Sequence, residues 1–462
     1  RDRLPNSALD SGSGAVGVSF ISEALHLGAS YSGLDSDYGV PGHAHAGAPG
    51  DAAGIRIDLK QRRTDLQGEW HADAGWLQGA RFKFGHANYR HAEIEPNSDV
   101  GTVFSNRGYD ARLELLHGDG KTWSGALGAH SSRSDFSAAG AEAFLPPSVT
   151  RSDALFAFEE VAQDPIAWQF GARVERTQIT SENGRRRRDH ELSGSLGAVW
   201  KLDATHAFAV SATHTGRAPN TQELFADGPH AGTQAYEIGD ADLRAERSLG
   251  LEASLRRRTG FVTGAVTVYA NRFSGYVFEQ PTGLVAIEDD GRWNFLPPDH
   301  PDVETAAESG LPVYRTVQRP ARFWGAEFET LWHLHDRQDW QLDLRLAADF
   351  TRAREGSRPL PRIPASRITT GLTWAHADWQ AGAESQFVFA QTRVAPLETT
   401  SDSYTLVSAW VSRTLTVGRA RWDLFLRGTN LSNSEARPHP SFVKALAPLP
   451  GRNFAAGVRL TF

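Results

Sequence analysis

The chain has 462 residues, of which 40% are hydrophobic and 22% are charged, and its formal net charge is -7. No apolar run is long enough for a membrane-spanning helix, which excludes a helical membrane protein. The negative charge gives no basic footprint for nucleic acid, and the absence of cysteine excludes disulfides and thiolate metal sites. Because no change in composition marks a boundary, we expect residues 1–462 to form one domain.

Apolar and polar side chains alternate strictly along much of the chain, which is the pattern of β-strands. Clear examples, in chain order, are the segments 168–175, 262–269, 341–350 and 453–462. In the third segment Leu342 and Leu344 alternate with Asp343 and Arg345. In a barrel within lipid the apolar face points outward and the charged face points to a wet lumen. The pattern predicts an all-β, antiparallel transmembrane β-barrel.

The connections between the predicted strands alternate in length. Short turns near 22–24, 118–121 and 203–205 alternate with long polar connections such as 33–54, 217–246 and 280–310. Short periplasmic turns and long extracellular loops are typical of outer-membrane barrels. The dense basic run from Arg185 to Arg188 follows Asn183-Gly184 and predicts an exposed loop tip.

This division gives about 19 strands of an expected 22, because bacterial single-chain barrels are even-numbered and large transporter barrels have about 22 strands. We therefore expect about three strands to be missing from the N-terminal side. The sequence shows no signal peptide at its start, and we expect that processing or truncation removed what came before Arg1.

Several segments resemble one family, the TonB-dependent outer-membrane receptors. Gly428 to Asn433, followed by Pro450 to Phe454 and the terminal Phe462, resemble the last two strands of these receptors. The run from Arg217 to Phe225, followed by Glu237-Ile238-Gly239 and Leu243 to Ser248, resembles their mid-barrel segment. Segments 3–7, 37–45 and 88–93 resemble the zinc-uptake branch of the family, the ZnuD type.

The resemblance implies a barrel of about 22 strands in the bacterial outer membrane, filled by an N-terminal plug. It also implies that transport is driven by the inner-membrane TonB–ExbB–ExbD complex. We find neither a plug nor a TonB box in these 462 residues. The resemblance implies that the TonB–ExbB–ExbD complex couples to the receptor through the plug, which these residues lack. We expect a monomer surrounded by outer-membrane lipid and lipopolysaccharide.

Three clusters of histidines and carboxylates fall in predicted extracellular loops and are candidate zinc ligands. They are, in chain order, His43 and His45, then His91 and Glu93, then Glu223, Asp227 and His230. Imidazole nitrogens and carboxylate oxygens are common zinc ligands. The alternative for the first cluster is a solvated loop, and the alternative for Glu223 is bracing of the barrel wall together with Arg217. The resemblance favours a structural role for His439 in the last long loop.

These features favour a receptor that takes up zinc through extracellular loop sites. Histidines in the same loops could instead hold haem or a metal chelate such as a siderophore, and a barrel without a plug could act as a passive pore. No phosphate loop, nucleophile elbow or His-Glu-x-x-His motif is present. We find no serine and histidine arrangement of the kind an outer-membrane phospholipase needs, so we expect no enzyme.

Overall fold

The computed structural model describes residues 4–41, 54–72, 75–140, 143–230, 232–337 and 339–462. These residues form one sheet of 23 strands, in which four short strands belong to loops and 19 long strands form the wall of a barrel. The strands of the wall are β1 (Leu9–Ile21), β2 (Leu25–Gly39), β3 (Arg56–His71), β4 (Leu77–Ile94), β5 (Val100–Gly118), β6 (Trp123–Ala139), β7 (Ser148–Gln163), β8 (Ile166–Ser181), β9 (Arg186–Lys201), β10 (His206–Arg217), β13 (Glu246–Arg257), β14 (Val262–Asp289), β16 (Leu311–Asp336), β17 (Trp340–Glu355), β19 (Arg367–His376), β20 (Trp379–Val388), β21 (Tyr404–Val417), β22 (Ala420–Thr429) and β23 (Asn453–Thr461).

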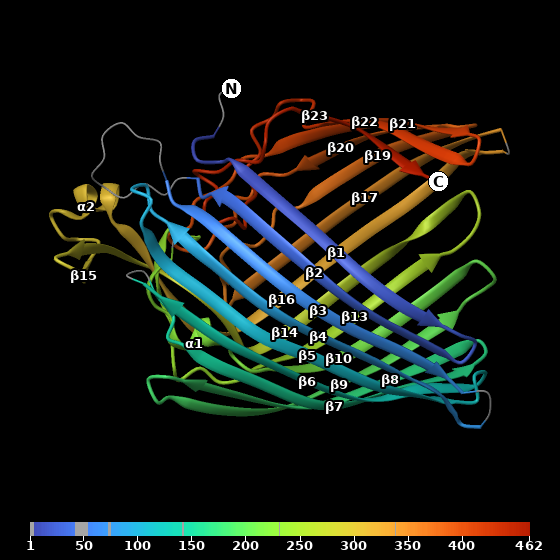
Figure 1. Ribbon diagram of the computed structural model, residues 1–462, viewed down its shortest axis with the longest axis horizontal. Coiled ribbons are helices and arrows are strands. Elements are labelled where there is room, and N and C mark those ends of the chain that lie inside the picture. The colour runs from blue at the N-terminus through green and yellow to red at the C-terminus, as the bar shows by residue number, and fades with distance from the viewer. Residues whose placement is uncertain (1–3, 42–53, 73–74, 141–142, 231, 338) are drawn as a thin grey trace.

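The remaining elements lie in the long loops. They are α1 (Thr221–Phe225), β11 (Asp227–His230), β12 (Ala235–Ile238), β15 (Arg292–Leu296), α2 (Val303–Ser309) and β18 (Arg358–Pro359). Figure 1 shows the long loops, with α1, α2 and β15, at one end of the wall and the short turns at the other. The predicted barrel, its division into about 19 long strands and the sorting of its connections are therefore confirmed.

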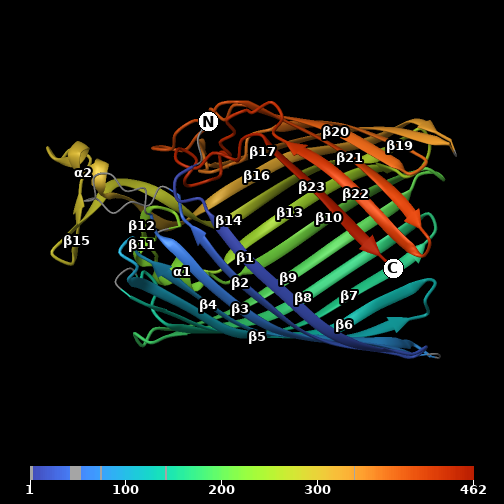
Figure 2. The same ribbon diagram turned by 45° about the horizontal axis from the view of Figure 1, so that its top comes forward.

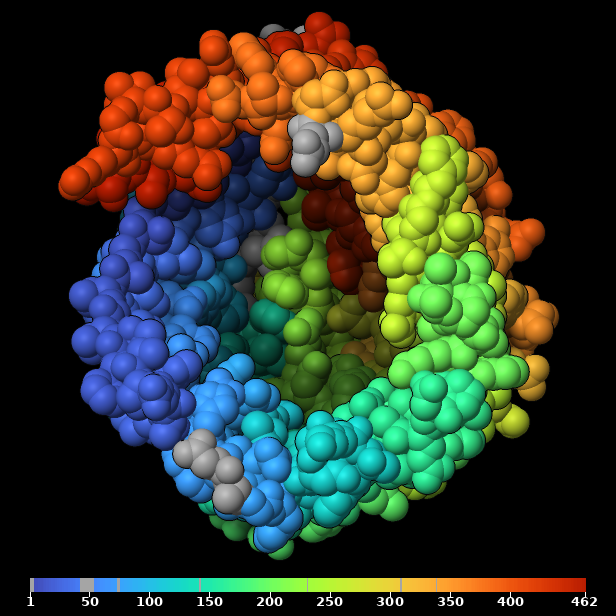
Figure 3. Space-filling model, turned by 90° about the vertical axis from the view of Figure 1, so that its right-hand side faces the viewer, coloured from blue at the N-terminus to red at the C-terminus, as the bar shows by residue number. Residues whose placement is uncertain are grey.

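Successive strands of the wall pair antiparallel, and they cross the barrel at a tilt (Figure 2). Within the described residues β1 pairs only with β2 and β23 pairs only with β22, so the sheet as described is an open barrel. Among the residues that the structure describes, the one parallel pairing joins the loop strand β12 to β16. Figure 3, viewed from the short-turn end, shows a hollow interior partly covered at its far end. No helix among the described residues is long and apolar enough to cross a membrane.

The two faces of the wall carry opposite chemistry, as β8 illustrates. Trp168, Phe170 and Val174 point outward and are 39%, 44% and 51% exposed. Between them, Gln169 and Arg173 point into the lumen, where Gln169 donates a hydrogen bond to Glu160 at 2.8 Å. Exposure of so much apolar surface to water would be unfavourable, whereas contact of the same surface with lipid hydrocarbon is favourable.

The buried apolar core lies at the extracellular mouth rather than inside the wall. Ile179 at the end of β8 packs with Leu224 and Phe225 of α1, together with Leu243 and Val277. The short helix thus folds inward and attaches the loop between β10 and β13 to the mouth. This packing positions the candidate site.

The orientation of the wall generates a first prediction, which compares arginine on its two faces. Leu127 faces lipid and Phe158, on the neighbouring strand, faces the lumen, and both are 44% exposed. Leu127→Arg should lower the free energy of unfolding by about 2–4 kcal/mol, because it places a charge in lipid near the bilayer midplane. Phe158→Arg should cost less, since the lumen is wet. Guanidinium unfolding in lipid vesicles, followed by tryptophan fluorescence, measures both, and equal losses would contradict the assigned faces.

Candidate functional site

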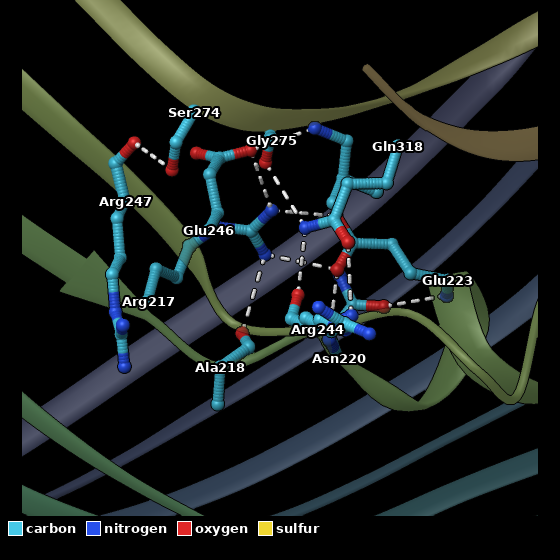
Figure 4. Close-up of polar contacts among 11 residues, drawn as sticks. Arg217, Ala218, Asn220, Glu223, Arg244, Glu246, Arg247, Ser274, Gly275 and Gln318 are labelled. Atoms are coloured by element: carbon cyan, nitrogen blue, oxygen red, sulfur yellow. Dashed lines mark hydrogen bonds and ion pairs between the residues drawn. The ribbon is translucent and has the colours of Figure 1, made fainter. Parts of the chain in front are cut away.

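The loop between β10 and β13 is locked to the wall by an arginine clamp (Figure 4). Arg217, the last residue of β10, donates two hydrogen bonds to Glu223, at 2.9 and 3.0 Å, and lies 3.4 Å from Glu246. Glu223 also closes a capping box at the start of α1, because its carboxylate accepts from the backbone N–H of Asn220 at 2.8 Å. These contacts support the bracing interpretation of Glu223.

A second set of contacts holds the end of this loop against β14 and β16. The side-chain amide of Gln318 donates to the backbone oxygens of Arg244 and Gly275, at 2.8 and 3.0 Å. Its oxygen accepts from the backbone N–H of Arg244 at 2.9 Å (Figure 4). Neutral hydrogen bonds of this kind satisfy backbone groups that would otherwise be left without partners where the chain turns. Both ends of the loop are therefore anchored.

His230 ends β11 and forms a hydrogen bond to a buried carboxylate. Its Nδ1 lies 2.8 Å from Oε1 of Glu237, which is only 2% exposed. Glu237 also accepts hydrogen bonds from Thr233 at 2.8 Å and from Gln222 at 2.7 Å. Burial by itself would raise the pKa of Glu237, but these hydrogen bonds and the charge of His230 outweigh it and hold the pKa below its usual value. A carboxylate on Nδ1 selects the tautomer whose Nε2 carries a lone pair.

His91, near the end of β4, belongs to the same part of the mouth. Its ring stacks on Phe104 at a centroid distance of 4.6 Å, and its Nδ1 lies 2.9 Å from the hydroxyl of Tyr89. The ring centroids of Phe104 and Phe144 are 6.3 Å apart, and Phe144 stacks on His230 with a centroid distance of 4.4 Å. Two imidazoles from elements far apart in the sequence thus border one apolar cluster.

The other candidate residues occupy nearby positions. Glu93 follows His91 by two residues on β4, and it is buried. Asp227 opens β11 and accepts a hydrogen bond from the hydroxyl of Tyr236 at 3.0 Å. Burial and the charge of Asp227 raise the pKa of Tyr236 far above its usual value.

His43 and His45 lie outside the described residues, but the neck of their loop is well defined. The backbone N–H of Val40 donates to the oxygen of Ile55 at 2.9 Å. Gln234, in the β11–β12 connection, donates from its side chain to the oxygen of Pro41 at 3.2 Å. The segment that carries both histidines therefore leaves the wall beside the hairpin of His230.

Within the described ranges, no group of three or more histidine, aspartate or glutamate side chains is arranged to hold a metal ion. His91 and His230 share a cluster, whereas Glu223 belongs to the clamp and Asp227 pairs with a tyrosine. Sequence reasoning missed Glu237, although Glu237-Ile238-Gly239 belongs to the segment that resembles the receptor family. No periodicity marks a residue whose role depends on a partner across a hairpin.

A serine, a histidine and a carboxylate do meet in the last long loops, contrary to the expectation from the sequence. Nδ1 of His439 lies 2.8 Å from the hydroxyl of Ser401, and its Nε2 lies 3.1 Å from Glu398. His439 is far from Ser401 and Glu398 in the sequence, so no motif based on sequence spacing can identify this arrangement. His439 is only 4% exposed, and the backbone N–H groups of Arg362 and Ala395 donate to Glu398. The cluster joins loops to one another, in line with a structural role for His439.

Comparisons with known proteins agree with this architecture. Residues 9–431 match the family model described as TonB dependent receptor-like, beta-barrel. The copper transporter OprC has a similar structure, with a TM-score of 0.77 and 16% identity over 97% of this chain and 71% of that one. The FrpB iron transporter from Neisseria meningitidis (F5-1 variant) aligns with a TM-score of 0.71 and 13% identity, over 98% of this chain and 73% of that one.

The alcaligin outer-membrane receptor FauA from Bordetella pertussis is also similar, with a TM-score of 0.61 and 14% identity over 98% of this chain and 68% of that chain. At such low identity these structures establish the fold alone. The family match is of a different kind, because it covers most of the sequence. Together with the membrane-spanning wall, it shows that this chain belongs to the TonB-dependent receptors of the outer membrane.

Proposed function

We propose that this receptor takes up zinc, and that the ion is first bound at the mouth by His230 and His91 with His43 and His45. The pairing of His230 with Glu237 is the observation that carries the proposal. In metal sites, a ligating histidine commonly donates its other ring N–H to a carboxylate, which orients the ring and raises its basicity. As in its family, transport would be driven through TonB, ExbB and ExbD.

The geometry of the Glu237 carboxylate supports a ligand role for His230. Because Glu237 is held by Thr233 and Gln222, it is fixed before any ion arrives. The imidazole then presents Nε2 without a reorganisation cost, which favours tight binding. The stacked ring of Phe144 limits the orientations of His230 further.

The covalent reach of the neighbouring loop supports a shared site. Pro41 is hydrogen-bonded to Gln234, four residues beyond His230. His43 follows Pro41 by two residues, which span about 7 Å when extended. Zinc usually takes four ligands, and nitrogen donors are among those it prefers. Histidines from the loop, from β4 and from β11 therefore offer a nitrogen-rich set.

The apolar surroundings support a cation stripped of its water. Phe104 and Phe144 are buried beside the two imidazoles. An apolar shell restricts solvent access to a metal site and strengthens its electrostatic interactions. A haem or chelate receptor would instead need room for a large ligand beside the histidines.

Substitution of the proposed ligands tests the assignment. His230→Ala and His91→Ala should each lower the zinc affinity of the plug-containing receptor by at least about tenfold, because one ligand is lost. Glu237→Gln should lower it about 10–100-fold through the orientation of His230. Calorimetric titration with zinc, repeated with haem and with a ferric siderophore, measures both affinity and preference.

His214→Ala is the matched control for these titrations, since His214 is exposed on β10, away from the mouth cluster. It should leave zinc binding unchanged. Equal zinc affinity in all variants would contradict the proposal, and preferential binding of haem or siderophore would favour the alternative ligand. Ion conductance without any ligand preference would indicate a passive pore.

The pKa of Glu237 gives a pH prediction. Because its pKa in the folded protein lies below the usual 4.5, Glu237 contributes stability above that value. This contribution should be lost as the pH falls through the lowered pKa. Hydrogen exchange of the β11–β12 hairpin should therefore be constant from neutral pH to about pH 5 after correction for intrinsic rates, and protection should decline below it. In Glu237→Gln the decline should be smaller, and an identical decline would contradict the assignment.

A further inference from the structure

The outward face of β6 to β9 changes from apolar to basic within a few residues on each strand. On β7 the outward side chains are Leu155, then Asp153, then Arg151, toward the mouth. Leu155 faces Val174 of β8 and Ala129 of β6 in register, which makes an apolar row. Beyond this row the outward face carries five arginines among other polar residues: Arg133, Arg151, Arg176, Arg186 and Arg188.

Two arginines stand directly opposite one another on this face. Arg133 of β6 is in register with Arg151 of β7, which is in register with Gln178 of β8. Like charges directly opposite on one face of an antiparallel pair destabilise a sheet unless something compensates them. Both side chains are about half exposed, at 45% and 53%, so their guanidinium groups remain accessible from outside.

The next two strands add basic residues around Gln178. With its amide in the orientation that satisfies its neighbours, the oxygen of Gln178 accepts from Nε of Arg176 at 3.1 Å and from Nε of Arg188 at 3.0 Å. Two cations thus converge on one neutral acceptor. The basic run from Arg185 to Arg188 is not simply the loop tip expected from the sequence. It leads into β9, with Arg186 and Arg188 facing outward and Arg187 facing inward, paired with Asp189 at 2.7 Å.

The carboxylates nearby neutralise only part of this charge. Asp135 and Asp153 pair with Arg133 and Arg151, each at 2.9 Å. Among the described residues, three further outward arginines, Arg176, Arg186 and Arg188, form no ion pair with a carboxylate. Arg176 lies in register with Asp153, but that carboxylate is already paired with Arg151. This basic face, defined by Arg133, Arg151, Arg176, Arg186 and Arg188, therefore carries a local excess of positive charge on a protein of net charge -7.

The corresponding outward face of β2 and β3 shows that such an excess is not general. There Arg62 pairs with Asp35 at 2.9 Å, Lys60 pairs with Asp58 at 3.4 Å, and Arg56 pairs with Asp37. Each cation on that face has a carboxylate of its own. The charge excess on β6 to β9 is therefore a local feature of the wall.

A cavity of about 1030 Å³ adjoins the basic face. Its lining includes apolar side chains of the lipid-facing rows, such as Phe82, Leu113 and Leu155, and polar side chains of the next row, Arg176 and His190. Acyl chains can lie along the apolar rows while anionic groups meet the guanidinium groups. Guanidinium forms paired, charge-assisted hydrogen bonds with phosphate.

We propose that the basic face binds the phosphate groups of a phosphorylated, multiply acylated glycolipid of the outer leaflet, of the lipid A type. The phosphate supplies the anionic partner that Arg176, Arg186 and Arg188 lack, and it adds to the carboxylates already paired with the opposed Arg133 and Arg151. The glycolipid thereby holds one sector of the wall at a defined position in the outer leaflet. This inference is independent of the ion that the receptor transports.

Binding of diphosphoryl lipid A to the purified receptor in detergent micelles tests the proposal. The probes are diphosphoryl lipid A, dephosphorylated lipid A with the same acyl chains, and inorganic phosphate. Native mass spectrometry and calorimetry should show binding of the first at least about tenfold tighter than of the other two, since charged hydrogen bonds to phosphate are lost. Equal binding of dephosphorylated lipid A would overturn the proposal. Equal binding of inorganic phosphate would also overturn it, because the basic face would then be a site for free anions and not for a glycolipid.

The double variant Arg176→Gln/Arg188→Gln should lower the affinity for diphosphoryl lipid A by about tenfold or more. Arg56→Gln/Arg62→Gln removes the same charge from the paired face of β2 and β3, and it should leave the affinity within about twofold if distant surface charge contributes little. Equal losses in both variants would overturn the proposal. Arg176→Lys/Arg188→Lys keeps the charge without the guanidinium fork and should give an intermediate affinity. Heat-modifiable electrophoretic mobility verifies that each variant is folded, and the lysine variant provides the test should the glutamine variant not fold.

Discussion

Backbone hydrogen bonding in lipid is the constraint on which the remaining structure depends. A peptide group that crosses the hydrocarbon region has no water to pair with, so each strand must find its partners in neighbouring strands. The long antiparallel ladders, such as the one between β14 and β16, satisfy this requirement. Because a strand sends alternate side chains to opposite faces, the same ladders produce an apolar outside and a polar inside.

The mouth follows a different rule, because its loops lie outside the hydrocarbon and must be held by side chains. Arg217 and Glu223 fasten the start of the loop after β10, and Gln318 fastens its end. The loop is therefore rigid enough to present His230 with Glu237 behind it. Preorganisation of this kind is what a high-affinity receptor site needs, since an ordered site has less entropy to lose on binding.

The outer surface of the wall is also differentiated around its circumference. On β2 and β3 cations and carboxylates are matched, whereas on β6 to β9 arginines outnumber their partners. Such an imbalance costs free energy in the isolated protein, and an anionic lipid offsets it in the membrane. The two faces of one strand can therefore serve different ligands, the lumen side facing the transport path and the outer side facing lipid.

The sequence by itself determined the wall. The alternation of Leu342 to Arg345 and the sorting of short and long connections depend on positions a few residues apart. Local covalent geometry sets these relations, so they can be read without a structure. Assignment of His43, His45, His91 and His230 as metal ligands stays a prediction.

Only the tertiary structure decided which distant residues meet. Strand register places Arg133 opposite Arg151. Strands and loops that fold back on one another bring Glu237 to His230, stack His91 on Phe104 and join Ser401 to His439. The basic run near Arg186 shows the same limit, since its composition suggests a loop and its pairing with β8 makes most of it a strand. Turn geometry and the apolar face of each strand set the register, but which side chains this brings opposite one another follows only once the neighbouring strands are aligned along their whole length.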